Sequence, residues 1–363
     1  MKIITIVGAR PQFIKAAMVS DQLRKRHTEI LVHTGQHYDY NMSDQFFVEL
    51  GMSAPKYNLG ISGGSHATMT GKMMIAIESV LLKENPDWVL VYGDTNTTLA
   101  AALTAAKIHI PVCHVEAGVR TKSRTNPEEI NRICTDNLST LLLASTKNGV
   151  DNLIKEGFDN NCFFVGDLMY DAFLKYSAEI TEPFIVESLH GGRLELPNEY
   201  YYLTCHREEN TRNDSSLQQI FQAMECLDAM TVYPVHPRNK ERAQRLIEKN
   251  KYRKILLIEP VGYLESMYLV KNSKKIVTDS GGLQREAFFA KKKCVTILDF
   301  ECWPETMLGN RNDLAHPNRN EILDKLSKEQ KIDESYIPFG NGHSAEKIIS
   351  LMEEFKLKRG EIM

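Results

Sequence analysis

The sequence predicts an α/β protein with two doubly wound domains, each a parallel sheet covered by helices on both faces. Two observations predict this class. Short β-branched runs alternate with longer segments of helical periodicity, and most of the short runs are apolar throughout. The chain has 363 residues, which is too many for one ordinary core, since domains usually hold roughly 100–200 residues.

The first half of the chain alternates strands and helices without a break. Strands are predicted at residues 2–7, 29–34, 88–92, 111–116 and 162–165. Helices are predicted at residues 14–26, 66–83, 97–106 and 127–138; the second has apolar residues at helical spacing and the last has a proline in its first turn. This regular alternation is typical of parallel sheets joined by helical crossovers.

The alternation stops at residues 178–199, which contain Pro183, Gly191, Gly192 and Pro197 and show weak periodicity. We interpret this segment as a connection into a second domain. Strands are predicted again at 200–205, 231–235, 255–258, 275–278 and 294–298, with helices between them and a last helix at about 344–358. The predicted domains are residues 1–170 and 171–344, and a terminal helix at 345–363 follows them.

Composition excludes several classes of protein. The net charge of −3 gives no global basic field, so nucleic acid is not an expected partner. No apolar run approaches the roughly 18–20 residues of a membrane helix, and the N-terminus lacks a signal peptide, so we expect a cytoplasmic protein without a membrane partner. Seven cysteines without a CxxC pair, and no HxH or HExxH spacing, predict neither disulfides nor a metal site.

Ionisable residues follow several predicted strands, where ligands bind in open parallel sheets. Arg10 and Lys15 follow the first strand and suit a diphosphate, although a solvated Arg and Lys would look the same. His206 and His236 follow strands of the second domain and could act as acid or base. The sequence therefore places candidate chemistry in both domains.

Three carboxylates, Asp94, Glu116 and Glu128, fall near the same predicted sheet edge. Close carboxylates raise one another's pKa, which makes an acid and a base from one residue type. Helix N-terminal capping is the alternative for Asp94 and Glu128, and it is the interpretation we prefer for Glu129. Glu116 ends an apolar strand and is harder to explain by structure alone.

A phosphate site is predicted at residues 278–284, which run from a strand through Ser280, Gly281 and Gly282 into a helix. Glycines expose backbone N–H groups, and the helix dipole favours an anion. An ordinary serine cap followed by a glycine turn is equally favoured. There is no GxGxxG after the first strand and no GxxxxGK[ST], so a dinucleotide or P-loop site is not favoured.

Taken together, a series of strings resembles the non-hydrolysing UDP-N-acetylglucosamine 2-epimerases. In chain order they are GARPQFIKAA, TGQHYD, YGDTNTT, HVEAGVRT, NPEEINR, CHREEN, YPVHPR, TDSGGLQREA and FGNGHSAEKI, and they cover essentially the whole chain. The resemblance implies two Rossmann-like doubly wound domains facing across a cleft, the GT-B-like arrangement, with helix 345–363 packing back on the first domain. It also implies a homodimer that binds a UDP-sugar and needs no metal or other cofactor.

The implied reaction is reversible epimerisation at C2 of a UDP-2-acetamido sugar. UDP is eliminated to leave a 2-acetamidoglucal and is added back after protonation from the other face. By motif, the resemblance assigns acid–base work to Asp94, Glu116 and Glu128, with the direction open, and places His206 beside the leaving diphosphate. It assigns substrate binding to Arg10, Lys15, Arg132, His236, Ser280, Gly281, Gly282 and Glu286, the last as an acceptor for ribose hydroxyls.

Departures from the commonest family pattern leave the sugar open. Gln12 stands where the best-known members have Glu, and the GARPQF opening resembles a branch that also handles modified sugars. UDP-2,3-diacetamido-uronic acids and UDP-2-acetamido-6-deoxy-hexoses are the alternative substrates. Three different functions also compete: a hydrolysing 2-epimerase, a glycosyltransferase of the same architecture and a non-catalytic UDP-sugar sensor. The opening motif disfavours the first, and the carboxylates disfavour the last.

Overall fold

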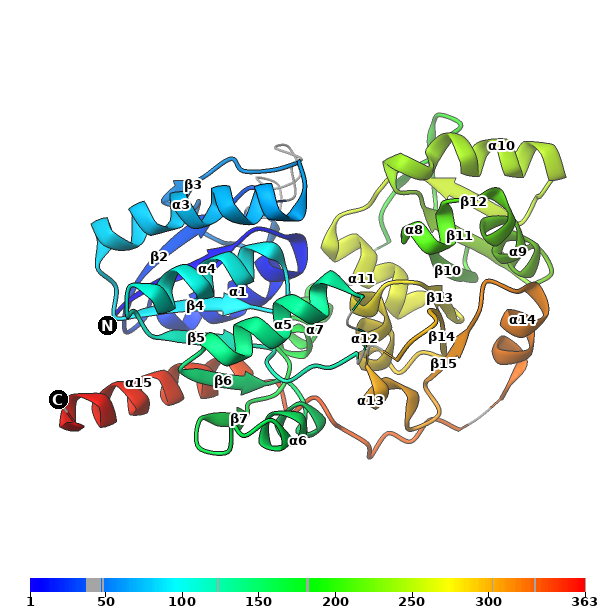
Figure 1. Ribbon diagram of the computed structural model, residues 1–363. Coiled ribbons are helices and arrows are strands. Elements are labelled where there is room, and N and C mark those ends of the chain that lie inside the picture. Colours follow the sequence, from blue (N-terminus) through cyan, green and yellow to red (C-terminus); the bar gives the residue numbers. More distant parts are fainter. Residues whose placement is uncertain are drawn as a thin grey trace. The chain divides into compact units, whose positions relative to one another are not determined.

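The computed structural model describes residues 1–36, 47, 49–121, 123, 125–180, 183–301, 303–329 and 331–362. The chain forms two compact units, each built on a parallel sheet with helices (Figure 1). Unit 1 is Met1–Ala172 with Pro338–Met363, and unit 2 is Phe173–Ile337. The predicted α/β class with two parallel-sheet domains is therefore confirmed. None of the helices among the described residues is both long and apolar enough to cross a membrane.

Within the described residues, unit 1 has a seven-stranded parallel sheet in the order β3-β2-β1-β4-β5-β6-β7. Its strands are β1 (Lys2–Val7), β2 (Thr28–His33), β3 (Tyr57–Asn58), β4 (Trp88–Tyr92), β5 (Val112–Val115), β6 (Leu141–Ala144) and β7 (Cys162–Phe164). Its helices are α1 (Arg10–Leu23), α3 (His66–Glu84), α4 (Asn96–Lys107), α5 (Pro127–Leu138), α6 (Lys147–Lys155), α15 (Ser344–Ile362) and the first half of α7 (Leu168–Ser177).

The central strands β4 and β5 position Asp94 and Glu116, two of the candidate residues from the sequence analysis. Both strands are buried along their whole length, as apolar strands covered on two faces must be. In their register, Val91 pairs with His114 and Tyr92 with Val115, so the turn that follows β4 lies beside Glu116, which follows β5. The small residues of α4 lie in the core with Val89 and Val91, which lets this helix pack closely on β4.

The last helix, α15, belongs to unit 1, where it contacts α1 and β6. Ile348, Ile349 and Met352 are fully buried on one of its faces. Its N-terminus is fixed by Asp171, whose carboxylate accepts hydrogen bonds from the Ser344 amide at 2.7 Å and the Ser344 hydroxyl at 2.8 Å. The sequence-based division gave residues 338–344 to the second domain, whereas this segment lies in unit 1.

Unit 2 has a six-stranded parallel sheet, counted over the described residues, in the order β12-β11-β10-β13-β14-β15. Its strands are β10 (Tyr200–Thr204), β11 (Met230–Pro234), β12 (Ile255–Ile258), β13 (Ile276–Thr278), β14 (Cys294–Ile297) and β15 (Asn312–Ala315). Its helices are α8 (Glu208–Thr211), α9 (Asp214–Glu225), the 3-10 helix η1 (Pro237–Asn239), α10 (Lys240–Asn250), α11 (Tyr263–Asn272), α12 (Gly281–Phe289), α13 (Pro304–Met307) and α14 (Arg319–Ser327).

Several predicted boundaries were wrong. The first helix begins at Arg10 rather than at Ile14, because Pro11 fits a first turn and the Gln12 side chain accepts the Gly8 and Ala9 amides at 2.8 and 3.0 Å. Strands β6 and β15, of four residues each, were missed because such short runs carry little periodicity. The segment interpreted as a connection holds a small antiparallel pair, β8 (Val186–Glu187) and β9 (Arg193–Leu194).

Candidate active site

The candidate site in unit 1 lies at the carboxyl ends of β4 and β5. Directly after each strand, one residue adopts the left-handed backbone conformation. Gly93 has φ +63° and Glu116 has φ +71°. A non-glycine residue in this region costs on the order of 1–3 kcal/mol and persists only where its surroundings hold it, which is common at functional sites. The Glu116 side chain is buried and lies 2.6 Å from the ammonium of Lys15, a buried residue of α1. Both groups lie against Gly93.

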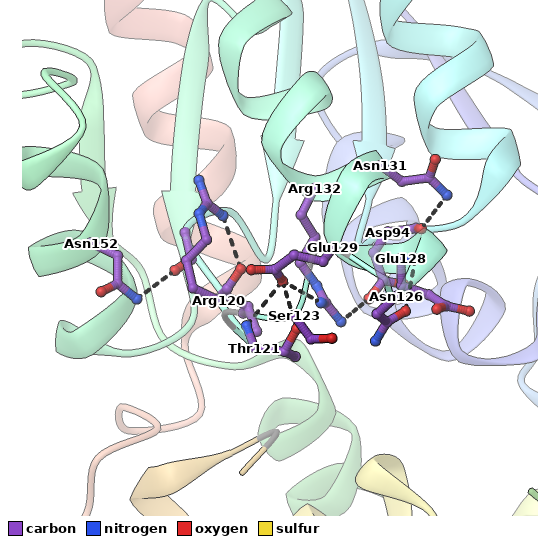
Figure 2. Close-up of polar contacts among 12 residues, drawn as sticks. Asp94, Arg120, Thr121, Ser123, Asn126, Glu128, Glu129, Asn131, Arg132 and Asn152 are labelled. Carbon is purple, nitrogen blue, oxygen red and sulfur yellow. Dashed lines mark hydrogen bonds and ion pairs between the residues drawn. The ribbon is translucent and has the colours of Figure 1, made fainter. Parts of the chain in front are cut away.

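Asp94 is held by helix α5. Its partly exposed carboxylate forms an ion pair with the buried guanidinium of Arg132, and its backbone carbonyl accepts a hydrogen bond from the side-chain Nδ2 of Asn131 at 2.9 Å (Figure 2). Arg132 also donates to Glu129 at 3.0 Å. Side chain and backbone of Asp94 are thus fixed by the same helix, which gives its carboxylate a defined direction.

The neighbouring residues Glu128 and Glu129 have opposite environments. Glu128 is exposed in the first turn of α5, and Asn126 caps that turn by accepting the Glu128 amide at 3.0 Å. Glu129 is buried and accepts the Thr121 amide and hydroxyl at 2.9 and 3.0 Å (Figure 2). Burial raises the pKa of Glu129, but the Thr121 hydrogen bonds and the Arg132 charge outweigh it, so this pKa lies below its ordinary value. The capping role preferred for Glu129 from the sequence was wrong: its carboxylate anchors Arg132.

The contacts of Asp94 and Glu116 differ from the expected pairing of like charges. Each carboxylate has a buried cation as its neighbour, Arg132 in one case and Lys15 in the other. From the sequence, Lys15 is assigned to a diphosphate and Arg132 to substrate binding, and in the structure each of them forms an ion pair with one of these carboxylates. Arg10 occupies the first position of α1 and is partly exposed at the same end of the sheet. Residues 37–39 of the TGQHYD string lie outside the described residues.

The candidate site in unit 2 is organised by Asp279, which the sequence did not single out. Its buried carboxylate follows β13 and accepts the backbone amides of His206 and Arg207, both at 2.9 Å, from the end of the adjacent β10. His206 also places Nδ1 3.2 Å from Asp279 Oδ1. The His236 ring stacks near that of His206, with centroids 6.5 Å apart. A polar residue at the end of a central strand was the signal available in the sequence.

The first turn of α12 has the features of an anion-binding helix N-terminus. The Ser280 hydroxyl caps the helix by accepting the Leu283 amide at 3.3 Å. Gly281 and Gly282 are partly exposed in that turn, and a Cβ on Gly282 would lie 3.6 Å from the Ser280 hydroxyl. Glu286, one turn further, is buried. The two interpretations of this segment are therefore compatible, since the capped turn leaves glycine amides uncovered by side chains.

We expect Asp279 to give the stability of the protein a dependence on acid pH. Burial raises the pKa of Asp279, but the hydrogen bond and charge of His206 and the backbone amides outweigh it, so this pKa is lowered on folding. The resulting stabilisation is fully present above the unfolded-state pKa of about 3.9 and is lost as the pH falls through the folded-state pKa. Urea denaturation between about pH 6 and pH 3 measures it. Asp279→Asn should flatten this slope, and an unchanged slope in that variant would contradict the assignment.

Within the described part of the chain, no three or more His, Cys, Asp or Glu side chains gather in a way that could hold a metal ion. The ionisable residues of the candidate sites instead form two separate sets. In unit 1, Asp94 and Glu116 are each paired with a cation. In unit 2, His206 is paired with Asp279 beside a glycine-rich helix N-terminus. Such sets can move protons and bind anions.

Comparison with known proteins agrees with these features. The model of the UDP-N-acetylglucosamine 2-epimerase family matches residues 21–353. A UDP-N-acetylglucosamine 2-epimerase homolog of Methanococcus maripaludis is 46% identical over 97% of this chain and 99% of its own length. The UDP-2,3-diacetamido-2,3-dideoxy-D-glucuronate 2-epimerase of Pseudomonas aeruginosa is 43% identical over 96% of this chain and 98% of its own.

A solved structure gives the same result at the level of the fold. The UDP-GlcNAc 2-epimerase of Methanocaldococcus jannaschii, in complex with UDP-GlcNAc and UDP, has a TM-score of 0.86 and 40% identity. The match covers 98% of this chain and 100% of that one. Because the family model and these relatives span nearly the whole sequence, the resemblance is confirmed, and the chain belongs to the UDP-N-acetylglucosamine 2-epimerase family.

Proposed function

We propose that the protein catalyses reversible epimerisation at C2 of a UDP-2-acetamido sugar, with UDP-GlcNAc and UDP-ManNAc as the first pair to test. The observation that carries the proposal is the placement of Asp94 and Glu116 at the ends of neighbouring strands, each held by a buried cation. The M. jannaschii relative, whose structure contains UDP-GlcNAc and UDP, supports the nucleotide.

The proposed reaction proceeds by elimination and re-addition. A base takes the proton from C2. The electron pair of the broken C2–H bond then forms the C1–C2 double bond, and the C1–O bond breaks to release UDP. UDP then adds back to C1 while an acid delivers a proton to the opposite face of C2. Asp94, Glu116 and Glu128 share this acid–base work, which typically contributes about 10²–10⁴-fold to a rate.

The leaving diphosphate needs positive charge and hydrogen-bond donors. We assign this role to His206, whose Nδ1 faces Asp279 and whose Nε2 is the nitrogen that would donate to phosphate. The Ser280 hydroxyl and the amides of Gly281 and Gly282 would bind the phosphates, and Glu286 would accept ribose hydroxyls. Arg10, Lys15, Arg132 and His236 complete the proposed set of binding residues.

A modified sugar is the alternative substrate. The P. aeruginosa relative, named for UDP-2,3-diacetamido-2,3-dideoxy-D-glucuronate, is 43% identical to this chain over nearly its whole length. This identity lies within the range of the identities to relatives named for UDP-N-acetylglucosamine, which are 46%, 42% and 40%. The sugar therefore has to be determined by direct comparison of the two substrates.

The test is incubation of the enzyme with each UDP-sugar in heavy water, followed by NMR. Epimerisation puts deuterium at C2 and gives both epimers without an acceptor. Free sugar and UDP accumulating together would indicate a hydrolysing enzyme, and turnover only with an acceptor would indicate a glycosyltransferase. If UDP binds but the C2 proton of neither substrate exchanges for deuterium, the proposed activity is refuted.

We further infer a homodimer that uses helix α3. Ile75 and Leu82 are 73% and 65% exposed and lie seven residues apart, hence on one face of this helix. Such exposed apolar side chains support an interface. Light scattering should give the mass of two chains, and Ile75→Glu with Leu82→Glu should give one. Ile337→Glu, at a position of similar exposure in unit 2, is the control and should leave the mass unchanged.

We also propose a cytoplasmic location. The described cysteines are free, and Cys113, Cys162, Cys205 and Cys294 are buried as thiols, which is typical of proteins from reducing compartments. Cell fractionation with an antibody to the protein tests this location.

A further inference from the structure

His114 is a buried histidine to which the proposed mechanism gives no role. It lies in β5, between β4 and β6, and its side chain is fully buried. Its Nδ1 is 2.7 Å from Asp136 Oδ1, and its Nε2 is 2.7 Å from the carbonyl oxygen of Gly93. A carbonyl oxygen can only accept, and a neutral imidazole has a single N–H group. Both contacts are satisfied together if both ring nitrogens donate.

Asp136 does not supply the missing proton. Its second oxygen accepts the Arg120 guanidinium at 2.7 Å and the Gly118 amide at 3.2 Å, and the positive charge of Arg120 favours an ionised carboxylate. Burial raises the pKa of Asp136, but the hydrogen bonds and charges of His114 and Arg120 outweigh it, and this pKa lies below its ordinary value. An ionised Asp136 leaves the proton on His114.

The two contacts of His114 connect it to the backbone beside Asp94 and Glu116, in the loops that follow β4 and β5. Gly93 directly precedes Asp94, and its carbonyl is the atom that His114 binds. Gly118 follows Glu116 by two residues, and its amide is bound by Asp136. A single buried pair therefore contacts the backbone next to both carboxylates.

Helix α5 reinforces this connection. It carries Asp136 and, one turn earlier, Arg132, which forms the ion pair with Asp94. Asn131 of the same helix binds the Asp94 carbonyl at 2.9 Å. Displacement of Asp136 would thus move the helix that directs the Asp94 carboxylate.

We propose that His114 is a buried imidazolium that positions Asp94 and Glu116 for the reaction, through the Gly93 carbonyl on one side and through Asp136 on the other. It is a positioning residue, since the structure places it behind the loops that bear the carboxylates. The kinetic part of this inference rests on the proposed function, whereas the protonation of the ring does not.

Two substitutions separate the contacts of His114. A glutamine amide nitrogen takes the place of Nε2 and keeps a donor toward Gly93, whereas an asparagine amide nitrogen takes the place of Nδ1 and keeps only the donor toward Asp136. We expect His114→Asn to lower kcat by about 100-fold, as misplacement by about 1 Å does, with little change in KM. His114→Gln should retain more of the turnover.

The matched control is His27→Gln. His27 also contacts a carboxylate, Glu353, at 2.7 Å, but it precedes β2 and therefore lies at the amino end of the strands. This variant should keep wild-type kcat. A folded His114→Asn variant with the kcat of the wild type would overturn the positioning role, as would equal losses of kcat in His27→Gln.

The protonation state is read by NMR of the enzyme labelled with ¹⁵N-histidine. Both ring nitrogens of His114 should show a directly bonded proton, and in Asp136→Asn the Nδ1 proton should be lost. A single N–H in the wild type would overturn the inference, even if His114→Asn fails to fold. This measurement needs no turnover, so a wild-type enzyme inactive on every UDP-sugar would refute the proposed function and leave the imidazolium to be judged by its own spectrum.

Discussion

Glu116→Gln is expected to lower turnover by about 10²–10⁴-fold, the usual contribution of a general acid or base. The amide has the size of the carboxylate but cannot take or deliver the C2 proton, and it loses the ion pair with Lys15 at 2.6 Å. Turnover is measured by C2 deuterium exchange, and UDP affinity by calorimetry. The UDP affinity should change much less than turnover, because Lys15 is the proposed binding residue that loses its ion pair, and Ser280, Gly281 and Gly282 of unit 2 are not altered.

A buried carboxylate elsewhere in unit 1 provides the control for this variant. Glu29 has a fully buried side chain that accepts the Arg24 guanidinium at 2.8 Å. It is the second residue of β2, so it lies at the amino end of its strand, and β1 separates β2 from β4. Glu29→Gln should lower stability and retain turnover. If folded Glu116→Gln turns over at the wild-type rate, Glu116 is not a catalytic residue.

Gly118→Ala is expected to destabilise unit 1 by about 3–4 kcal/mol, since left-handed strain and overpacking each cost about 1–3 kcal/mol. Gly118 has φ +78°, and an added Cβ would lie 2.2 Å from the carbonyl oxygen of Gly149 in α6. A backbone atom cannot turn away as a side chain can. Helix α6 would therefore have to move away from the loop after β5.

The matched control is Gly157→Ala, where φ is +94° and an added Cβ meets nothing within 4 Å. This variant keeps the backbone strain without the clash and should cost only about 1 kcal/mol. The chain has two tryptophans, one in each unit. In a Trp303→Phe background, urea denaturation followed by fluorescence of the buried Trp88 reports unit 1 alone. Equal destabilisation by the two alanines would show that the clash is absorbed without cost.

The fold class was predictable because strand and helix periodicities survive in the sequence. Apolar runs such as Trp88–Tyr92 are buried along their whole length, so the hydrophobic pattern of each segment predicts which of its residues are buried. The positions of Asp94 and Glu116 followed from a general property of parallel sheets, in which ligands meet the carboxyl ends of the strands. Short strands such as Leu141–Ala144 were missed because four apolar residues fit a helix equally well.

The partners of the site residues could not be predicted in the same way. Lys15 and Glu116 are about a hundred residues apart in sequence, and their contact depends on how α1 packs against β1 and β4. Glu129 looked like a capping residue because its neighbour Glu128 occupies the same helical turn, yet only one of the two side chains faces the protein. Side-chain direction and tertiary partners decide these roles, and neither is encoded in local spacing.

The position of α15 has a consequence for biosynthesis. Residues 173–337 are complete as a unit before the ribosome has made the helix that finishes the first one. Until then, α1 and β6 lack their contacts with α15. The nascent N-terminal half therefore exposes the apolar surface that α15 later covers. The part that is translated first therefore matures last, and a premature stop near residue 340 would leave it unfinished however well the second part had folded.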